Sequence, residues 1–427
     1  MQHNTQKNQN LDSQTQPTRQ STHQSTQQPT QKSAHLPQLP QRNSKFYLLL
    51  NMAALAAFGP FVTDFYLPAL PNIENVFETT TSLVQLSITC SLVGLAFGQL
   101  LMGPLSDMYG RKKILQISLV LFVLSTIACL FSWDIYSFIG FRLIQGIAGS
   151  GGIVISKSIV ADLFKGQELA RFFAMLSAIQ GLAPICAPIF GGFVLKFTDW
   201  HGIFSILLGI GLVLCVSIVF FKETLSVEKR LKGRFWESFS FLRILKNKQF
   251  VLYSLTQTCA MGIMFSFIAS SSFIFQNHFG LSNLEYSFCF AAAAFGITLG
   301  ASMTPLFKSE KLAFKVGICG VLLLGILACF ILNSSTHFLI VILGFAIMLV
   351  FLGFILPSST SLAMSMERQN AGNASAVLGF SFFVFGGIVS PLTGLGEDIF
   401  FATSVVVCVC AIGTAMLGFW ALRSDRE

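Results

Sequence analysis

The sequence predicts an all-α polytopic membrane protein with twelve transmembrane helices in two six-helix halves. Hydrophobic residues make up 53% of the 427 residues and charged residues only 11%, which is half or less of the charged share in soluble domains. The apolar residues fall into runs that can each cross a hydrocarbon core of about 30 Å. A long polar break at residues 223–248 separates six such runs from six more.

The chain begins with a polar segment, residues 1–44, that is rich in Gln, Ser, Thr, Asn and Pro. Such a composition buries too little apolar surface to offset the entropy of ordering, so we expect a disordered tail. It does not resemble a signal peptide, because no apolar stretch begins before residue 46.

The twelve apolar runs define the two halves. The first half, 45–222, contains the runs 46–69, 82–103, 113–132, 135–160, 170–196 and 201–221. The second half, 249–422, contains the runs 249–276, 284–306, 312–332, 336–360, 373–396 and 399–422. A short tail, 423–427, follows.

The linker 223–248 is basic and places Phe235, Phe239 and Leu242 at helical spacing. This pattern is typical of a short amphipathic helix that lies on the inner leaflet.

The basic residues indicate how the chain is oriented. Lys and Arg are concentrated in alternate connections, for example at Arg111, Lys112 and Lys113, whereas Glu74 and Asp134 fall in the connections between them. Because short basic loops stay in the cytoplasm, we expect both termini to be cytoplasmic and the protein to lie in a bacterial inner (plasma) membrane. The net charge of +8 is therefore a topology signal, and we expect no nucleic-acid partner.

A charged motif separates the second and third runs, at Gly103-Pro104-Leu105-Ser106-Asp107-Met108-Tyr109-Gly110-Arg111-Lys112-Lys113. Gly103 lets helices approach closely, Gly110 permits a tight turn, and Asp107 lies near three cations. This predicts a latch between the halves on the cytoplasmic side; the alternative is an ordinary basic loop. The pattern G-x-x-x-D-x-x-G-R-K resembles the signature loop of the major facilitator superfamily, and the resemblance implies Asp162 as a partner of Arg111.

Two further motifs extend the resemblance. Arg142, followed by Gln145 and Gly146, is similar to the R-x-x-Q-G motif of the proton-driven branches. The fifth run carries a pattern that resembles the antiporter motif G-P-x-x-G-G, although Ala187 replaces a glycine. Because kinked helices also occur in symporters, this motif favours export without requiring it. Its residues are Gly181, Pro184, Pro188, Gly191 and Gly192.

The first run ends in Thr63-Asp64-Phe65-Tyr66-Leu67-Pro68, and the sixth opens with Trp200-His201-Gly202. Together these segments resemble the bicyclomycin-resistance (Bcr/CflA) type of drug:proton antiporter. The resemblance covers residues 46–225 strongly and is weaker in the second half.

Asp64 and Arg142 lie at similar depths, each about 7–11 Å below the outer face at about 1.5 Å per residue. Charged groups at such depths are functional candidates. We expect Asp64 to exchange the coupling proton and Arg142 to modulate that exchange. The alternatives are a static ion pair and an aspartate that caps the helix end.

The substrate cavity is expected between runs one, four, seven and ten. Met and Phe offer adaptable apolar contact to varied amphiphiles, although each residue could equally serve plain packing. The candidates are Tyr66, Gln145, Gln257, Met261, Met264 and Phe265. Lys157 is expected to extend towards the cytoplasm.

These observations predict a proton-coupled, monomeric exporter of small amphiphilic compounds such as antibiotics, which works by alternating access. It would need no cofactor beyond the proton gradient, and its partners would be substrate, protons and lipid. An exporter of an amino acid, nucleoside or sugar is the alternative transporter. A sensor or enzyme is disfavoured, because the sequence lacks H-E-x-x-H, G-x-S-x-G and Walker A motifs.

Overall fold

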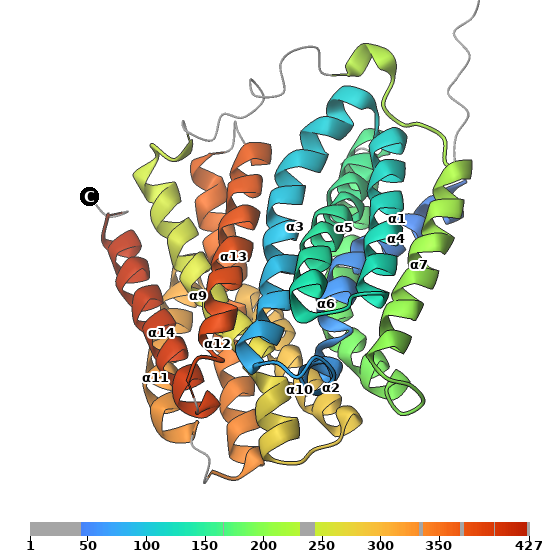
Figure 1. Ribbon diagram of the computed structural model, residues 1–427. Helices are drawn as coiled ribbons and strands as arrows, with labels where there is room; N and C mark the ends of the chain where they lie inside the picture. Colours follow the sequence, from blue (N-terminus) through green and yellow to red (C-terminus); the bar gives the residue numbers. More distant parts are fainter. Residues whose placement is uncertain are drawn as a thin grey trace, which may run out of the picture. The chain divides into compact units, whose positions relative to one another are not determined.

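The computed structural model describes residues 44–164, 166–230, 244–332, 336–367, 371–396 and 398–424. Twelve helices of 20 to 29 residues run through this part of the chain (Figure 1). The first half contains α1 (Lys45–Asp64), α3 (Thr81–Tyr109), α4 (Arg111–Leu130), α5 (Ile135–Leu163), α6 (Gly166–Val194) and α7 (Trp200–Phe220). The second contains α9 (Lys248–Ser272), α10 (Asn283–Met303), α11 (Glu310–Ile331), α12 (Phe338–Met366), α13 (Ala371–Leu392) and α14 (Ile399–Ser424).

The predicted fold class is confirmed. Eleven helices of the described residues are long and apolar enough to span a membrane, and the twelfth, α6, contributes the apolar stretch Ile179–Val194. The predicted tail 1–44, apart from Ser44, and the predicted amphipathic helix of the linker lie outside the described residues.

Apolar side chains cover the outer faces of the bundle, as Val213, Phe330 and Val409 do. Several buried hydroxyls bond within their own helix, for example Ser254 to the carbonyl of Phe250 (2.7 Å) and Ser266 to that of Gly262 (2.8 Å). A serine that donates to the carbonyl four residues earlier needs no external partner, so these polar residues are compatible with a lipid-embedded helix.

Side-chain caps fix where helices begin. Asp134 accepts a hydrogen bond from the backbone N–H of Ser137 (2.7 Å), and the Ser137 hydroxyl completes a capping box at the start of α5. The backbone and side-chain hydrogen bonds from Ser137 lower the pKa of Asp134. This cap sets the start of α5 and hence the register of Arg142.

Three helix ends differ from the prediction by five or more residues. The α-helix of the first span does not continue to residue 69: α1 ends at Asp64, and a 3-10 turn (η1, Leu67–Ala69) and α2 (Leu70–Val76) follow. Pro68 explains the break, because it has no N–H to donate to the carbonyl of Asp64 and its ring would clash with that carbonyl. In α3 the motif that begins at Gly103 is helical as far as Tyr109, and only Gly110, at φ 103°, makes the turn. α12 continues to Met366, past the predicted end at 360.

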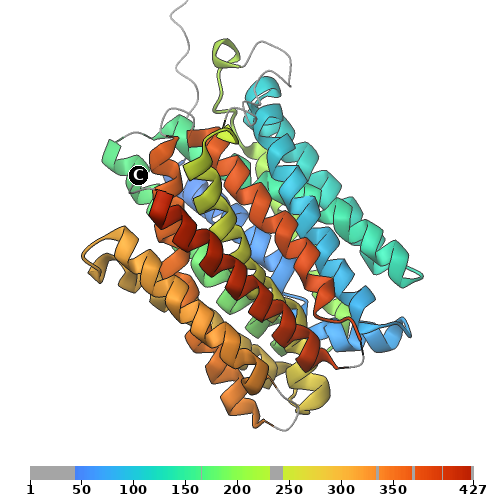
Figure 2. The ribbon, with the colours of Figure 1, turned by 90° about the vertical axis from the view of Figure 1, so that its left-hand side faces the viewer.

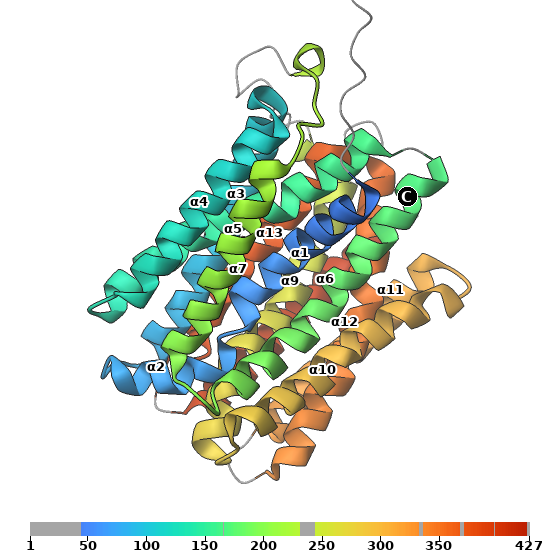
Figure 3. The same ribbon diagram turned by 90° about the vertical axis from the view of Figure 1, so that its right-hand side faces the viewer.

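The two halves meet along a few helices. α3 packs on α13, α6 packs on α10, and η1 contacts α9. The view in Figure 3 shows α6 beside α10 at this boundary, and Figure 2 shows α9, α13 and α14 of the second half from the other side. We call the end that carries Arg111 the basic end of the bundle, and the end that carries α2 the opposite end.

Candidate functional site

A cavity of about 480 Å³ lies between the halves, with walls from α1, α3, α5 and α6 on one side and α9, α10, α12 and α13 on the other. Its lining is mostly apolar and includes Leu92, Ile153, Met261, Phe265 and Phe382. A few polar side chains interrupt this surface: Thr63, Asp64, Gln99, Lys157, Gln180, Gln257, Thr298, Thr360 and Ser375. A cavity of this size and character suits a small amphiphilic molecule.

The cavity is closed at the opposite end by hydrogen bonds between the halves. Ser272 donates to the carbonyl of Leu67 (2.8 Å), and Gln276 donates to that of Pro68 (3.1 Å). Gln85 adds a bond to the carbonyl of Ala269 (3.0 Å). From this closure the cavity extends towards the basic end, where Gln99, Lys157 and Ser375 line it. We call the hydrogen bonds that Ser272, Gln276 and Gln85 form between the halves the opposite-end seal.

Four of the six predicted cavity residues line this space: Gln257, Met261, Met264 and Phe265. Gln257 also accepts a hydrogen bond from Thr360 (3.3 Å). Tyr66 and Gln145 do not line it, and the prediction for these two residues is wrong. Both are fully buried inside the first half, because they supply partners for Arg142.

Arg142 is enclosed by the first half. It donates to the carbonyl of Val62 (3.0 Å) and to the side-chain oxygen of Gln145. Its guanidinium carbon lies 4.2 Å from the ring centre of Tyr66 and 5.6 Å from that of Phe204. Cation–π contacts of this kind stabilise a desolvated guanidinium. Gln145 is held in turn by the hydroxyl of Thr126 (2.7 Å).

Asp64 is the last residue of α1; it is only 5% exposed and lies in the cavity wall. The alternative of a static ion pair with Arg142 is not present, because the guanidinium bonds to the Val62 carbonyl two residues earlier. Among the described residues no ion pair includes Asp64. Burying an unpaired carboxylate is costly, and a bound proton or a cationic ligand removes that cost.

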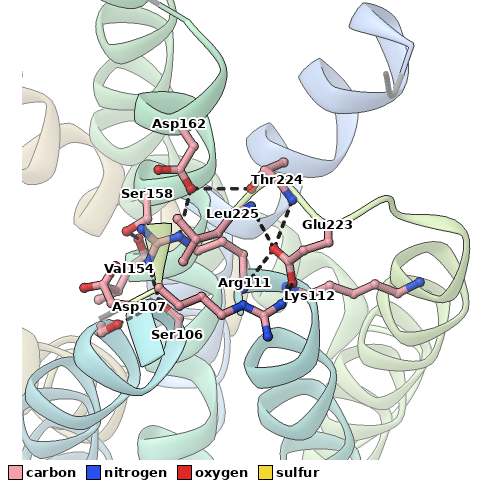
Figure 4. Close-up of polar contacts among 12 residues, drawn as sticks. Ser106, Asp107, Arg111, Lys112, Val154, Ser158, Asp162, Glu223, Thr224 and Leu225 are labelled. Carbon is pink, nitrogen blue, oxygen red and sulfur yellow. Dashed lines mark hydrogen bonds and ion pairs between the residues drawn. The ribbon is translucent and has the colours of Figure 1, made fainter. Parts of the chain in front are cut away.

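The charged motif forms a compact cluster at the basic end (Figure 4). Arg111 is 6% exposed; it pairs with Asp162 (2.9 Å) and with Asp107 and donates to the hydroxyl of Ser106 (2.7 Å). Structure and prediction therefore agree on Arg111 and Asp162 as neighbours. These contacts all lie within the first half, so the cluster seen here ties α3, α4 and α5 together and does not latch the two halves. The side chain of Lys112 donates to the carbonyl of Val219 (2.7 Å).

Glu223, just beyond α7, is a member of this cluster that the sequence analysis missed. Its carboxylate accepts from the backbone N–H groups of Arg111 (3.0 Å) and Lys112 (3.2 Å). Two more bonds come from the N–H groups of Thr224 and Leu225. A carboxylate at a helix N-terminus satisfies free N–H groups and complements the helix dipole. Only its position directly after an apolar run, at a basic loop, could have indicated this role.

The antiporter-like motif spans the cavity and the boundary between the halves. Gly181 and Pro184 line the cavity, and Pro188 is buried. A Cβ at Gly191 would strike the carbonyl oxygen of Phe65, and one at Gly192 would strike Ser287 of α10. The small residues thus let α6 approach α1 and α10 at the opposite end. Gly103 has more space, since its nearest neighbour would be Val154 at 3.4 Å.

Comparison with known proteins gives a consistent result. Residues 51–391 match the family described as Major Facilitator Superfamily. The MFS-type transporter YdgK of Bacillus subtilis is 34% identical over 91% of this chain and 98% of its own length. The bicyclomycin resistance protein homolog of Haemophilus influenzae is 29% identical (82% of this chain, 90% of its own). A chloramphenicol resistance protein of Pseudomonas aeruginosa is 28% identical (87% and 88%).

Among solved structures, a bacterial homolog of the human lysosomal transporter Spinster, in an inward-facing and unoccupied conformation, superposes with a TM-score of 0.70. It is 17% identical and covers 89% of this chain and 98% of its own. At that identity the likeness concerns the fold.

Proposed function

We propose that this chain, a multi-pass transporter that belongs to the major facilitator superfamily, is a proton-coupled exporter of small amphiphilic compounds, including antibiotics. It would work in the bacterial inner membrane as a monomer with both termini in the cytoplasm. Similarity to proteins named for bicyclomycin and chloramphenicol resistance supports drug efflux. The basic end, where Arg111 and Lys112 lie, would face the cytoplasm.

The observation that carries this proposal is the place of Asp64. Its carboxylate lies in an otherwise largely apolar cavity wall, without an ion-pair partner among the described residues. Three residues later, the carbonyl of Leu67 accepts a bond of the opposite-end seal. A change of charge on Asp64 therefore acts close to the contact that must open for release. Asp64 would take up a proton when the cavity faces outwards and release it when the cavity faces the cytoplasm. This exchange would couple the proton gradient to export of the substrate.

The first test expresses the protein in an efflux-deficient bacterium and scores tolerance to a compound panel with and without a protonophore. The expected result is increased tolerance to several amphiphiles, which the protonophore abolishes. If no tolerance changes, drug export is the wrong function and export of a metabolite takes its place.

The second test follows proton-driven uptake into everted vesicles by Asp64→Asn and Asp64→Glu. The Asn variant keeps the volume but cannot exchange a proton, so coupled transport should be lost; the Glu variant should keep part of it. Full activity of Asp64→Asn would exclude Asp64 from coupling.

A further inference from the structure

Lys157 of α5 lines the wall of the cavity. Its side chain is half-buried, and among the described residues it takes part in no ion pair. The nearby carboxylates of Asp107 and Asp162 are already engaged by Arg111. Lys157 is thus a cation that has no anion of its own.

The position of Lys157 relative to Asp64 follows from one helix contact. A Cβ at Gly59 of α1 would lie 2.5 Å from the side chain of Ile153 of α5. Asp64 is five residues beyond this crossing towards the opposite end, and Lys157 is four residues beyond it towards the basic end. At about 1.5 Å per residue, the two backbone positions are about 14 Å apart along the bundle.

The Cα–Cβ bond of Lys157 points towards that interval. In an α-helix the Cα–Cβ bond tilts towards the N-terminus, which for α5 is the opposite end. Asp64 and Lys157 are the two charged residues in the described lining of the cavity, and the surface between them is mostly apolar. They are too far apart to neutralise each other directly, yet one small molecule can reach both.

We propose that Lys157 is a substrate-binding residue, which holds the anionic end of a zwitterionic amphiphile whose cationic end lies against Asp64. This rests on the proposed function in that the cavity must be the substrate site. A charge-assisted hydrogen bond to a desolvated ammonium is stronger than a neutral one, and an unpaired charge in apolar surroundings is costly. The cavity therefore selects molecules with an acid and a base at opposite ends of an apolar body.

The experiment compares two fluorescent probes that differ at one group. Rhodamine 110 is a zwitterion with a free carboxylate, and rhodamine 123 is its cationic methyl ester. Fluorescence polarisation measures the binding of each to purified protein in detergent. Wild-type protein should bind rhodamine 110 more tightly than rhodamine 123. Lys157→Met should lower the affinity for rhodamine 110 about tenfold, which corresponds to the loss of one charge-assisted hydrogen bond, and should change the affinity for the ester little. Lys157→Arg should restore the preference.

Three controls separate this role from a structural one. Lys113→Gln removes an exposed lysine that lies over Tyr109 (5.8 Å to the ring centre), and it should leave both affinities unchanged. Asp64→Asn should lower the affinities for both probes and leave the ratio of the two affinities unchanged, because both probes carry the cation. Thermal unfolding verifies that Lys157→Met is folded.

Three results would each overturn the inference. The preference for rhodamine 110 could survive in folded Lys157→Met, wild-type protein could prefer the ester, or wild-type protein could bind neither probe. The measurement uses no proton gradient, so it is independent of coupling. If Asp64→Asn transports normally while Lys157→Met abolishes the preference for rhodamine 110, the proposed role of Asp64 in proton coupling is wrong and the role of Lys157 in binding is supported.

Discussion

The guanidinium of Arg142 lies among uncharged partners inside the first half. The carbonyl of Val62, the amide of Gln145 and the rings of Tyr66 and Phe204 surround it. Because it bonds to the backbone of α1 two residues before Asp64, its influence on Asp64 passes through the position of the helix end. We therefore propose that Arg142 acts as a positioning residue in this conformation.

Replacing Arg142 tests this positioning role. Arg142→Met should lower both transport and the thermal unfolding temperature, since each buried acceptor that loses its donor costs about 1–3 kcal/mol. Arg142→Lys keeps the charge but not the forked geometry, so it should recover only part of the stability. If Arg142 acts only through its charge, Arg142→Met should abolish transport and leave the thermal unfolding temperature unchanged.

Glu223 supplies a second residue-scale prediction. Glu223→Gln keeps the size but turns one acceptor oxygen into a donor, which then faces the N–H groups that begin α4. Hydrogen exchange of the amides of Arg111 and Lys112 should become faster. Glu228→Gln is the matched control, because this exposed glutamate lies in the same segment and, within the part of the chain that the structure describes, forms no ion pair with α4. Equal exchange in both variants would contradict the capping role.

Residue positions were predictable where composition and depth decide them. Asp64 stood out as a carboxylate in an apolar run, and Met261 and Phe265 stood out as adaptable apolar groups on a central helix; the structure places all three in the cavity wall. Tyr66 and Gln145 were misassigned because a sequence does not show the partners that a buried arginine requires. Glu223 was missed because its hydrogen bonds are to backbone, which carries no sequence signal.

Helix packing explains why small residues recur in α3 and α5. A Cβ at Gly146 would strike the carbonyl of Ser91, and one at Gly94 would strike that of Leu143. Gly149, one turn further along α5, has its nearest neighbour, Val62, at 3.7 Å. Small residues along a helix are typical of a face that packs closely, but a sequence alone does not show which glycine lies at the point of closest approach.

The two glycines give a matched pair at the scale of the element. Gly146→Ala forces backbones apart, and overpacking of this kind costs about 1–3 kcal/mol. Gly149→Ala makes ordinary van der Waals contact, so its cost should be small. Thermal unfolding of both variants in the same detergent measures the difference. If the two melt alike, α3 and α5 are not held together by the Gly146 contact.

Helix boundaries were predictable to within four residues, except at the ends of α1, α3 and α12. Hydropathy marked α4 and α7 well because charged or polar residues flank them. It overran the end of α1 because Phe65 to Leu70 are apolar while Pro68 ends the helix. It stopped short in α3 because the polar residues Ser106 and Asp107 remain helical, and in α12 because Ser361 to Met366 do. The errors in α1 and α3 concern the segments that carry Asp64 and the charged cluster.

At the scale of the whole molecule, the two ends of the bundle differ in how the halves meet. The opposite-end seal uses backbone carbonyls of η1 as acceptors, and these lie directly after Asp64. Asn277 adds a bond to Glu74 of α2 (3.4 Å), and Ser82 adds one to the carbonyl of Pro391 (3.4 Å). Each bond is worth only about 0.5–1.5 kcal/mol net. Several weak bonds suit a closure that must open in every cycle, since a small bias then shifts the population.

Removing one bond of the seal should therefore move the conformational equilibrium without unfolding the protein. Ser272→Ala deletes the donor to Leu67 and an acceptor for Gln276, and a loss of about 1 kcal/mol should favour opening several-fold. Spin labels at the exposed positions Val76 and Leu395, in a cysteine-free background, report the distance between the halves at this end. The distribution should gain a longer component in Ser272→Ala. Ser302→Ala is the control, because this exposed serine bonds only within α10 (3.1 Å to Leu299). Identical distributions in the two variants would mean that the Ser272 bond does not hold the seal.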